Sequence, residues 1–237
     1  MTNFVHKGED KKKYVKEMFN DISKTYDLIN ILSSFGVDRY WRYRLINKIK
    51  LKSSQHLLDV ATGTGDVAFG FLKKYNVSVT GVDIAKNMIK ISKKKALKHS
   101  GNINFIEGDA EDMKFKDLSF DALTISFGFR NLGSYDKGLS EFHRVLKNNG
   151  KLAILEFSKP TSKWFAPIFK FYFNKIVPRI GSLLSRKDAY LYLPESVDYF
   201  LTREDVCKKM KSAGFKNIIY KNYTFGIATL YIGDKIE

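Results

Sequence analysis

Apolar and polar residues change their spacing several times along this chain, and each change marks an expected element. From residue 55 to residue 157, short apolar runs alternate with stretches in which apolar residues recur every three or four positions. The short runs predict buried strands, and the longer spacing predicts amphipathic helices. The expected strands cover 55–60, 77–83, 103–109, 120–126 and 151–157, and the expected helices cover 66–74, 85–98 and 135–147, with a short helix after 109.

Strands that alternate with helices form a parallel sheet with helices on both faces. In such a sheet, ligands bind outside the carboxyl ends of the strands, at the point where the strand order reverses. Several polar or glycine-rich positions fall at those ends, namely the turn after the first strand, Asp83, Asp109-Ala110 and Ser126. We therefore expect the functional site at this edge of the sheet.

A long helical segment precedes the first strand. Apolar residues from Val15 to Ile29 recur at three- and four-residue steps, which places them on one helix face. The pattern runs from Tyr14 to Asn47 and breaks near 33–36, and Asp38 is a plausible cap for the helix that follows. Residues 1–13 are polar, and we expect them to be frayed.

The alternation ends after residue 160. Residues 161–200 carry no strand signal, and their apolar residues keep a helical spacing that two prolines interrupt. A helix is expected from Thr202 to Ala213-Gly214, with acidic residues in its first turn. The last two strands, 215–223 and 224–233, must pair antiparallel because the turn between them is so short.

These elements predict a single domain over residues 1–237. Its expected parts are a helical cap at 14–50, a ligand-binding core at 51–160, a lid insertion at 161–200 and closing elements at 201–237. The chain has 237 residues, of which 44% are hydrophobic, and this is enough for one sizeable core.

Cysteine and histidine usage excludes several classes of site. The single Cys207 excludes a disulfide framework and a cysteine-based zinc site, and the four histidines stand apart from one another, so we expect no metal. No secretory signal is visible at the N-terminus. No window approaches the roughly 18 apolar residues of a spanning helix, so we expect a cytoplasmic protein.

The net charge of +16 does not identify a partner by itself. Nucleic acid, an anionic membrane face and an acidic ligand are all compatible with it. A lysine-rich solvated surface explains it equally well, because the lysines are dispersed along the chain.

The glycine-rich turn has the spacing of a nucleotide-binding loop. Gly63-x-Gly65-x-x-Ala68 follows a strand and opens a helix, and Asp83 lies 20 residues after Gly63, where an acid would hold a ribose. Taken alone, this pattern fits an NAD-dependent enzyme. Three features favour another nucleotide ligand: the long helical N-terminal segment, the antiparallel final strands, and Asp109-Ala110, which suit an adenine amine.

Five sequence blocks extend this motif: DVATGTGD, GVDIAKNMI, GDAEDMKF, FDALTISFGFRN and RVLKNNGKLAILEFSKP. In this order and spacing they resemble an S-adenosylmethionine-dependent methyltransferase. YDLINILSSFGVDRYWR, ISFGFRN with LEFSKP, and YLYLPESVDYF resemble more narrowly the UbiE/MenG/Coq5 family of quinone-ring C-methyltransferases. The resemblance covers about residues 14–233. One departure is Asn148-Asn149-Gly150, where the family usually has Pro-Gly-Gly; asparagine tolerates the left-handed angles of such a turn.

The resemblance implies a Rossmann-like class I methyltransferase fold. Its sheet is seven-stranded and mostly parallel, with an antiparallel C-terminal strand, a helical N-terminal segment and a helical lid. The implied cofactor is S-adenosylmethionine, and the favoured reaction is the methylation of demethylmenaquinol to menaquinol. The alternatives are a dual menaquinone and ubiquinone enzyme, and a methyltransferase acting on another small molecule or lipid.

The resemblance also implies which residues line the cofactor pocket. Asp83 accepts hydrogen bonds from both ribose hydroxyls, or instead only caps the helix at 85–98. Asp109 meets the adenine amine, with Ala110 small enough for the ring to lie close. Ser126 either lines the pocket or merely closes a strand. The full set is Gly63, Thr64, Gly65, Asp83, Asp109, Ala110 and Ser126.

For the chemistry, a ring carbon becomes a good nucleophile when the adjacent hydroxyl loses its proton. Arg130 is expected to stabilise that phenolate, since an arginine stays protonated, and to orient a water that takes the proton. Asn131 positions the oxygen. Asp66 is a candidate acid/base partner, or it caps its helix or holds the methionine amine. The alternative for Arg130 is a surface salt bridge.

The resemblance also implies that a cluster of aromatic and polar residues in the N-terminal segment lies over the active site and binds the substrate. These residues are Tyr26, Asn30, Arg39 and Arg42; core packing is the alternative and is the preferred explanation of Trp41. Glu156, His143 and Cys207 receive no role.

The implied substrate carries a prenyl tail and lives in a bilayer. The segment 163–184 could then line a channel for the tail, rest on an anionic membrane, or simply be a lid packed on the domain. The expected partners are the quinol and an anionic membrane, with a homodimer allowed, and the location is the cytoplasm or the inner face of the membrane. We expect no nucleic-acid partner. A basic RNA-binding protein is the rival from another functional class, and it requires clustered cations and aromatics on one face.

Overall fold

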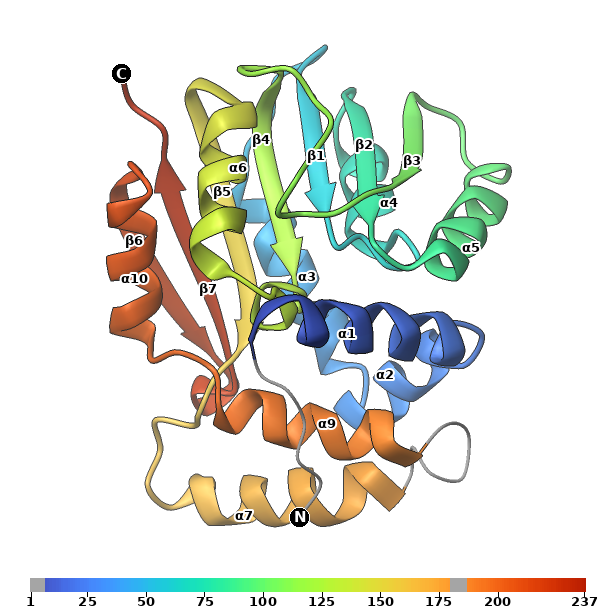
Figure 1. Ribbon diagram of the computed structural model, residues 1–237, viewed down its shortest axis with the longest axis vertical. Coiled ribbons are helices and arrows are strands. Elements are labelled where there is room, and N and C mark those ends of the chain that lie inside the picture. The colour runs from blue at the N-terminus through green and yellow to red at the C-terminus, as the bar shows by residue number, and fades with distance from the viewer. Residues whose placement is uncertain (1–6, 180–186) are drawn as a thin grey trace.

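A seven-stranded sheet forms the centre of the molecule in the computed structural model, which describes residues 7–179 and 187–237 (Figure 1). The strand order is β3-β2-β1-β4-β5-β7-β6, and only β7 runs against its neighbours. The resemblance predicted this arrangement, and the structure confirms it. The strands are β1 (His56–Val60), β2 (Ser78–Asp83), β3 (Ile103–Glu107), β4 (Phe120–Ser126), β5 (Leu146–Phe157), β6 (Lys216–Tyr223) and β7 (Ala228–Asp234).

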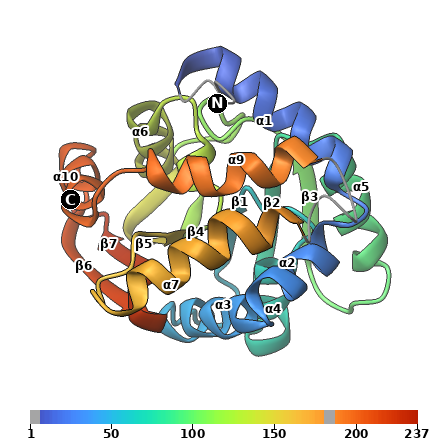
Figure 2. The same ribbon diagram turned by 90° about the horizontal axis from the view of Figure 1, so that it is seen from below.

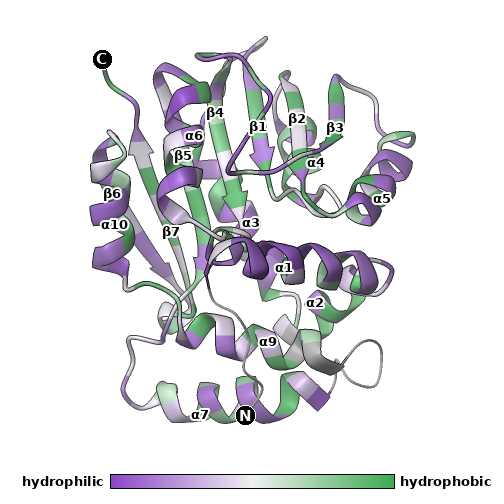
Figure 3. Ribbon diagram, viewed as in Figure 1, coloured by the Kyte–Doolittle hydropathy of each residue, from purple (hydrophilic) through white to green (hydrophobic). Residues whose placement is uncertain are grey.

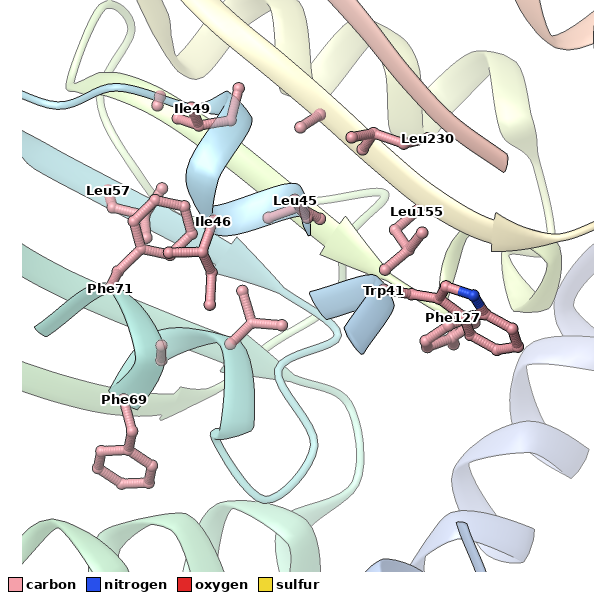
Figure 4. Packing of buried hydrophobic residues seen from close by; sticks show 14 of the residues in the cluster. Trp41, Leu45, Ile46, Ile49, Leu57, Phe69, Phe71, Phe127, Leu155 and Leu230 are labelled. Carbon is pink, nitrogen blue, oxygen red and sulfur yellow. The ribbon is translucent and has the colours of Figure 1, made fainter. Parts of the chain in front are cut away.

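Helices cover both faces of the sheet. Apolar side chains of α3 (Val37–Lys48), α4 (Asp66–Lys74) and α5 (Lys86–Ala96) join one buried cluster with one face of the sheet. Side chains of α6 (Tyr135–Val145) and α10 (Arg203–Ser212) join the cluster on the opposite face. Figure 4 shows Trp41, Leu45 and Ile46 of α3 in the first cluster, where the Trp41 ring lies 6.0 Å from that of Phe127. The predicted core packing of Trp41 is therefore confirmed.

The remaining helices lie below the carboxyl ends of the strands. They are α1 (Gly8–Ile22) and α2 (Tyr26–Ser34) from the N-terminal part, and α7 (Phe165–Phe171), η2 (Tyr172–Ile176) and α9 (Lys187–Asp198) from the lid segment. Figure 2 shows α9 and α7 crossing in front of the sheet, with α1 on one side and α2 on the other. The end of the predicted lid helix, 180–184, lies outside the described residues. No helix among the described residues is long and apolar enough to span a bilayer.

Several predicted elements were wrong in detail. Residues 8–13 belong to α1 rather than to a frayed tail, and a second break at 23–25 separates α1 from α2. Gly36, not Asp38, is the N-cap of α3. No helix lies between 108 and 119, where the chain makes only turns and one isolated bridge. Strand β5 starts five residues earlier than expected, at Leu146.

The C-terminal predictions agree with the structure. The Thr202 hydroxyl accepts a hydrogen bond from the Asp205 backbone N–H at the start of α10, as a helix cap does. Strands β6 and β7 pair antiparallel, with a 3-10 turn, η3 (Thr224–Gly226), between them. This closing pair sets β7 beside β5 and completes the sheet.

Candidate active site

The site begins at two strained turns at the centre of the sheet. The strand order reverses between β1 and β4, and the residues just past these strands, Ala61 and Phe127, have φ values of 50° and 59°. Left-handed angles are costly for residues other than glycine and concentrate at functional sites. Gly65 has a φ of 93°, and a Cβ there would lie 2.7 Å from the Phe69 ring, so only glycine fits. The backbone thus turns sharply, with left-handed angles, at the topological switch point of the sheet.

One cavity at this edge contains most of the predicted cofactor residues. Its polar lining comes from the ends of β1, β2, β3 and β4, and its lid comes from α1 and α2. The Ser126 Oγ is buried and has no hydrogen-bond partner among the described residues. Such an atom is unusual unless a ligand or water satisfies it. Five of the seven predicted cofactor residues line this cavity: Gly63, Asp83, Asp109, Ala110 and Ser126.

Asp83 is a buried carboxylate of this cavity, and both of its oxygens accept backbone hydrogen bonds. One oxygen accepts a hydrogen bond from the Gly63 backbone N–H and the other from that of Ala85, both at 2.8 Å. The predicted capping contact at the start of α5 therefore exists, and the carboxylate still faces the cavity. Burial raises the pKa of Asp83 to about 6, and the two backbone hydrogen bonds oppose that shift.

Asp109 lines the same cavity just past the neighbouring strand β3 and is paired with a cation from α1. The Lys12 Nζ is 2.8 Å from one carboxylate oxygen of Asp109 and 3.5 Å from Glu111. The other oxygen of Asp109 accepts a hydrogen bond from the Glu111 backbone N–H. Sequence reasoning missed Lys12 and Glu111, because the pairing joins residues 97 positions apart in a segment that looked frayed.

Thr64 and Asp66 lie beside the cavity rather than in it. Both line a small polar recess on the other side of the glycine turn, together with Asp59. The Thr64 hydroxyl donates to Asp27 and accepts from the Lys95 ammonium. The Asp66 carboxylate is 45% exposed and lies 3.5 Å from both Lys95 and Arg42. Gly65, just before α4, shapes the turn and lines neither space.

A second cavity of about 360 Å³ lies between the N-terminal helices and the lid. Its volume falls in the range of small-molecule pockets. Aromatic and aliphatic side chains of α1, α3, α7, η2 and α9 make most of its wall, and few polar groups reach it. Three residues, Phe19, Tyr26 and Phe127, line this apolar cavity and the first cavity alike. The two spaces therefore adjoin at these side chains.

Arg130 is the main cation of the apolar cavity. It is only 5% exposed, so the alternative of a surface salt bridge is wrong. Its Nη1 lies 2.7 Å from Glu156, which is fully buried, and also donates to the Phe127 carbonyl oxygen. The guanidinium carbon lies 5.3 Å from the Phe157 ring centre. Glu156 received no role from the sequence, yet it fixes both the side chain and the backbone N–H of Arg130.

The other predicted substrate residues do not all meet. Tyr26, Asn30 and Arg42 line the apolar cavity, but Arg39 lines only an open groove on the outer side of α3. Burial raises the pKa of Tyr26, and the nearby Arg42 opposes that shift. Asn131 lines the first cavity and accepts a hydrogen bond from the Tyr192 hydroxyl.

No group of three metal-binding side chains occurs within the described parts of the chain. The site thus consists of a polar cavity with buried carboxylates, which adjoins an apolar cavity lined by Arg130 and Arg42. Such a pair of cavities can hold a polar cofactor against an apolar acceptor.

Comparison with known proteins agrees with this geometry. A model of the ubiE/COQ5 methyltransferase family matches residues 7–235. The chain is 46% identical over 230 residues to a ubiquinone/menaquinone biosynthesis C-methyltransferase UbiE of Citrifermentans bemidjiense, covering 95% of this chain and 98% of the relative. It is 43% identical over 229 residues to a demethylmenaquinone methyltransferase of Deinococcus radiodurans, covering 96% and 95%.

The fold also matches solved structures. Haemonchus contortus phosphoethanolamine N-methyltransferase 2, in complex with S-adenosyl-L-methionine, superposes with a TM-score of 0.61. That match is 17% identical and covers 79% of this chain and 50% of the other. At this level of identity the likeness concerns the fold alone.

Proposed function

The chain belongs to the ubiE/COQ5 methyltransferase family, and we propose that it methylates a ring carbon of demethylmenaquinol to give menaquinol. It is a C-methyltransferase of quinone biosynthesis, and its cofactor is S-adenosylmethionine. The observation that carries the choice of substrate is the apolar cavity beside the cofactor cavity. A fused aromatic ring suits walls of Phe and Tyr side chains, and the buried Arg130 in such a wall suits a ring with an ionisable hydroxyl.

The residues of the first cavity fit the cofactor. Bound S-adenosylmethionine supplies a methyl group on a positively charged sulfur. Asp83 offers two carboxylate oxygens, as the two ribose hydroxyls require, and Asp109 offers an acceptor for the adenine amine. The Ser126 hydroxyl is buried and has no hydrogen-bond partner within 7–179 and 187–237, and the cofactor would provide one. A side chain at Gly63 would project toward Tyr26 and into the same space.

The polar recess suits the amino-acid end of the cofactor. Thr64 and Asp66 line it, next to the glycine turn. We propose that Asp66 holds the ammonium group, because its carboxylate lines this recess and is partly exposed. Gly65 keeps the turn in the conformation that opens the recess.

Arg130 then acts on the acceptor ring. Its guanidinium lies in a buried, largely apolar space, where a fixed cation stabilises a phenolate strongly. It stays protonated, so the proton must leave through a water that Arg130 and its partners orient. Asn131 offers a side-chain amide beside the junction of the cavities, and Tyr26, Asn30 and Arg42 border the ring. Arg39, outside the cavity, has no direct contact to offer.

Methyl transfer to two reduced acceptors tests the proposed function. The chain is incubated with labelled S-adenosylmethionine and either a demethylmenaquinol or a demethylated benzoquinol. Product from the naphthoquinol alone supports the proposal, and product from both indicates a dual enzyme. Cofactor binding with no product from either acceptor contradicts the quinol assignment and leaves a methyltransferase for another small molecule.

We also propose that the lid rests on an anionic membrane, at the inner face of the cytoplasmic membrane. Between Glu156 and Asp188 the chain has no acidic residue and seven basic ones. Figure 3 shows hydrophobic and hydrophilic residues mixed along α7, whose residues are all at least partly exposed. Phe35 lines the apolar cavity yet is 80% exposed, at a φ of 50°, so it lies at the cavity opening. A prenyl tail could leave the cavity there and enter the bilayer.

Vesicle binding checks the membrane contact. Phe171 is 62% exposed on α7, and Phe171→Ser is expected to weaken binding to anionic vesicles about tenfold, from the transfer free energy of its ring. Lys163→Glu and Lys170→Glu are each expected to weaken it about fivefold. The matched control is Leu97→Ser, a change of an exposed residue just past α5. Equal binding of the parent to neutral and anionic vesicles, or to neither, contradicts the contact.

A second copy of the chain is the other candidate for the exposed apolar residues of the lid. Sedimentation velocity without vesicles distinguishes the two. A dimer that Phe171→Ser dissociates assigns the surface to a homodimer, whereas a monomer leaves it to the membrane.

A further inference from the structure

One sequence block has no role in the proposed function, namely YLYLPESVDYF at 190–200. Most of it forms α9, which lies beside the short helix η1 (Phe129–Asn131) that carries Arg130 and Asn131, two of the three predicted catalytic residues. Tyr192 and Ser196 are four positions apart on α9 and therefore point to one side of the helix. Both side chains are buried there; Tyr192 contacts Asn131 and Ser196 contacts Arg130.

Tyr192 contacts Asn131. Its hydroxyl donates a hydrogen bond to the Asn131 Oδ1 at 3.2 Å, and its ring lines the apolar cavity. Burial raises the pKa of Tyr192 to about 12, so the hydroxyl remains a donor at neutral pH. With Oδ1 engaged, the Asn131 amide must turn its N–H groups elsewhere, and one of them points to the Phe127 carbonyl oxygen. Tyr192 thus selects which end of the amide is free to meet a ring oxygen.

Ser196 contacts Arg130. Its Oγ accepts a hydrogen bond from the Arg130 Nε at 3.2 Å and donates one to the Leu193 carbonyl oxygen. Glu156 holds the guanidinium from β5 through Nη1, and Ser196 holds it from the lid through Nε. The remaining nitrogen, Nη2, is then the one that can turn toward the cavity. The planar guanidinium of Arg130 is oriented more strictly by these two buried contacts, which come from separate elements, than by either contact alone.

We propose that Tyr192 and Ser196 are positioning residues of the reaction: the lid helix α9 orients Asn131 through Tyr192 and Arg130 through Ser196. This proposal rests on the proposed function, because it concerns how Arg130 and Asn131, the two residues proposed to act on the quinol, are oriented. The lid is then part of the catalytic centre as well as a cover over the ring. The reaction is therefore expected to need α9 in the position that it has here, in contact with Arg130 and Asn131.

The effect of this positioning is a lower pKa of the bound quinol hydroxyl. The groups facing Arg130 are Glu156 of β5, Lys11 of α1, Tyr135 of α6, Tyr26 of α2 and Tyr192. Burial lowers the pKa of Lys11 to about 8, so the ionisation of Lys11 already contributes to the pH profile of kcat in the parent. Only the difference between a variant and the parent reports on the lid contacts.

The test removes each hydroxyl separately with Tyr192→Phe and Ser196→Ala. Each is expected to lower kcat about tenfold, with the KM for S-adenosylmethionine within about twofold of the parent. The acidic limb of the kcat profile is expected to move up by about one pH unit, because a misplaced cation lowers the hydroxyl pKa less. In an Asn131→Ala background, Tyr192→Phe is expected to cost nothing further. The controls are Tyr220→Phe on the exposed edge strand β6 and Ser212→Ala at the exposed end of α10.

The outcomes separate this proposal from the one it rests on. A parent that methylates no quinol contradicts the proposed function. A parent that is active, with Arg130 and Asn131 variants impaired but both hydroxyl variants at parental kcat and pH profile, contradicts only the role of α9. An equal loss in the control variants also contradicts it. Because the two hydroxyls are removed independently, one variant that fails to fold leaves the other to decide.

Discussion

Arg130→Lys is expected to lower kcat about a hundredfold while the affinity for S-adenosylmethionine stays near that of the parent. Lysine keeps the charge but loses the planar fork that meets Glu156, the Phe127 carbonyl oxygen and Ser196 together. Removing one preorganised donor that stabilises a developing oxyanion costs about 100- to 1,000-fold in kcat. The measurement is single-turnover methylation of demethylmenaquinol, with cofactor affinity measured by calorimetry on the same samples.

A neutral replacement needs a compensating change. Glu156 is fully buried, and removing its partner alone would leave an unpaired buried charge that costs about 3–5 kcal/mol of stability. Arg130→Met is therefore combined with Glu156→Gln, and the midpoint of thermal unfolding is compared with that of the parent. Activity of the double variant within about tenfold of the parent, in a folded protein, would contradict a catalytic role for Arg130.

The lining of the cavity proposed for the cofactor could be predicted because its residues sit at or just past the ends of strands. Gly63, Asp83, Asp109 and Ser126 each follow or end a short apolar run. Once those runs are read as parallel strands, their carboxyl ends must meet at one edge. The structure places all four around one cavity. Local sequence was enough, since the sheet itself brings these positions together.

The contacts that tie the helices to this edge could not be predicted. Lys11 donates to the Arg130 carbonyl oxygen and Lys12 pairs with Asp109, across 119 and 97 positions of sequence. In the sequence these lysines are part of a polar tail with no apolar periodicity. Glu156 was missed for a related reason: a single acid in an apolar strand shows no sign of the arginine that neutralises it. Ion pairs between residues far apart in the sequence leave no local sequence pattern from which they could be predicted.

The break at 23–25 escaped detection for a different reason. Apolar residues continue at three- and four-residue steps from Ile22 to Tyr26 and Ile29, as they would in one continuous helix. Periodicity reports which side chains face a core, and two short helices facing the same core preserve it. Here the bend lets α1 cover the first cavity while α2 supplies Tyr26 and Asn30 to the second.

Asp83→Asn is expected to weaken S-adenosylmethionine binding about 100- to 1,000-fold. An ionised carboxylate can accept a charge-assisted hydrogen bond from each ribose hydroxyl, and such bonds contribute about 1.5–3 kcal/mol apiece. The amide retains one acceptor and sets a donor against a backbone N–H of Gly63 or Ala85. Calorimetric titration at pH 7 measures the loss. The control is Asp121→Asn, on β4 at the opposite end of the sheet, where the carboxylate meets the His56 backbone N–H and Lys147.

The pH dependence separates binding from stability. Because burial raises the pKa of Asp83 to about 6, above the unfolded value near 3.8, the native state binds the extra proton. The contribution of Asp83 to stability is then greatest below about pH 4 and falls by about 3 kcal/mol as pH rises through 6. Cofactor affinity changes in the opposite direction, since the ribose hydroxyls need the ionised form, and rises up to about tenfold per pH unit below pH 6.

Asp83→Asn should remove the rise in affinity and leave a protein at least as stable as the parent at pH 7. A variant that binds weakly but keeps the parental pH dependence would show that another group, such as the neighbouring Asp59, whose pKa burial also raises to about 6, controls the cofactor site.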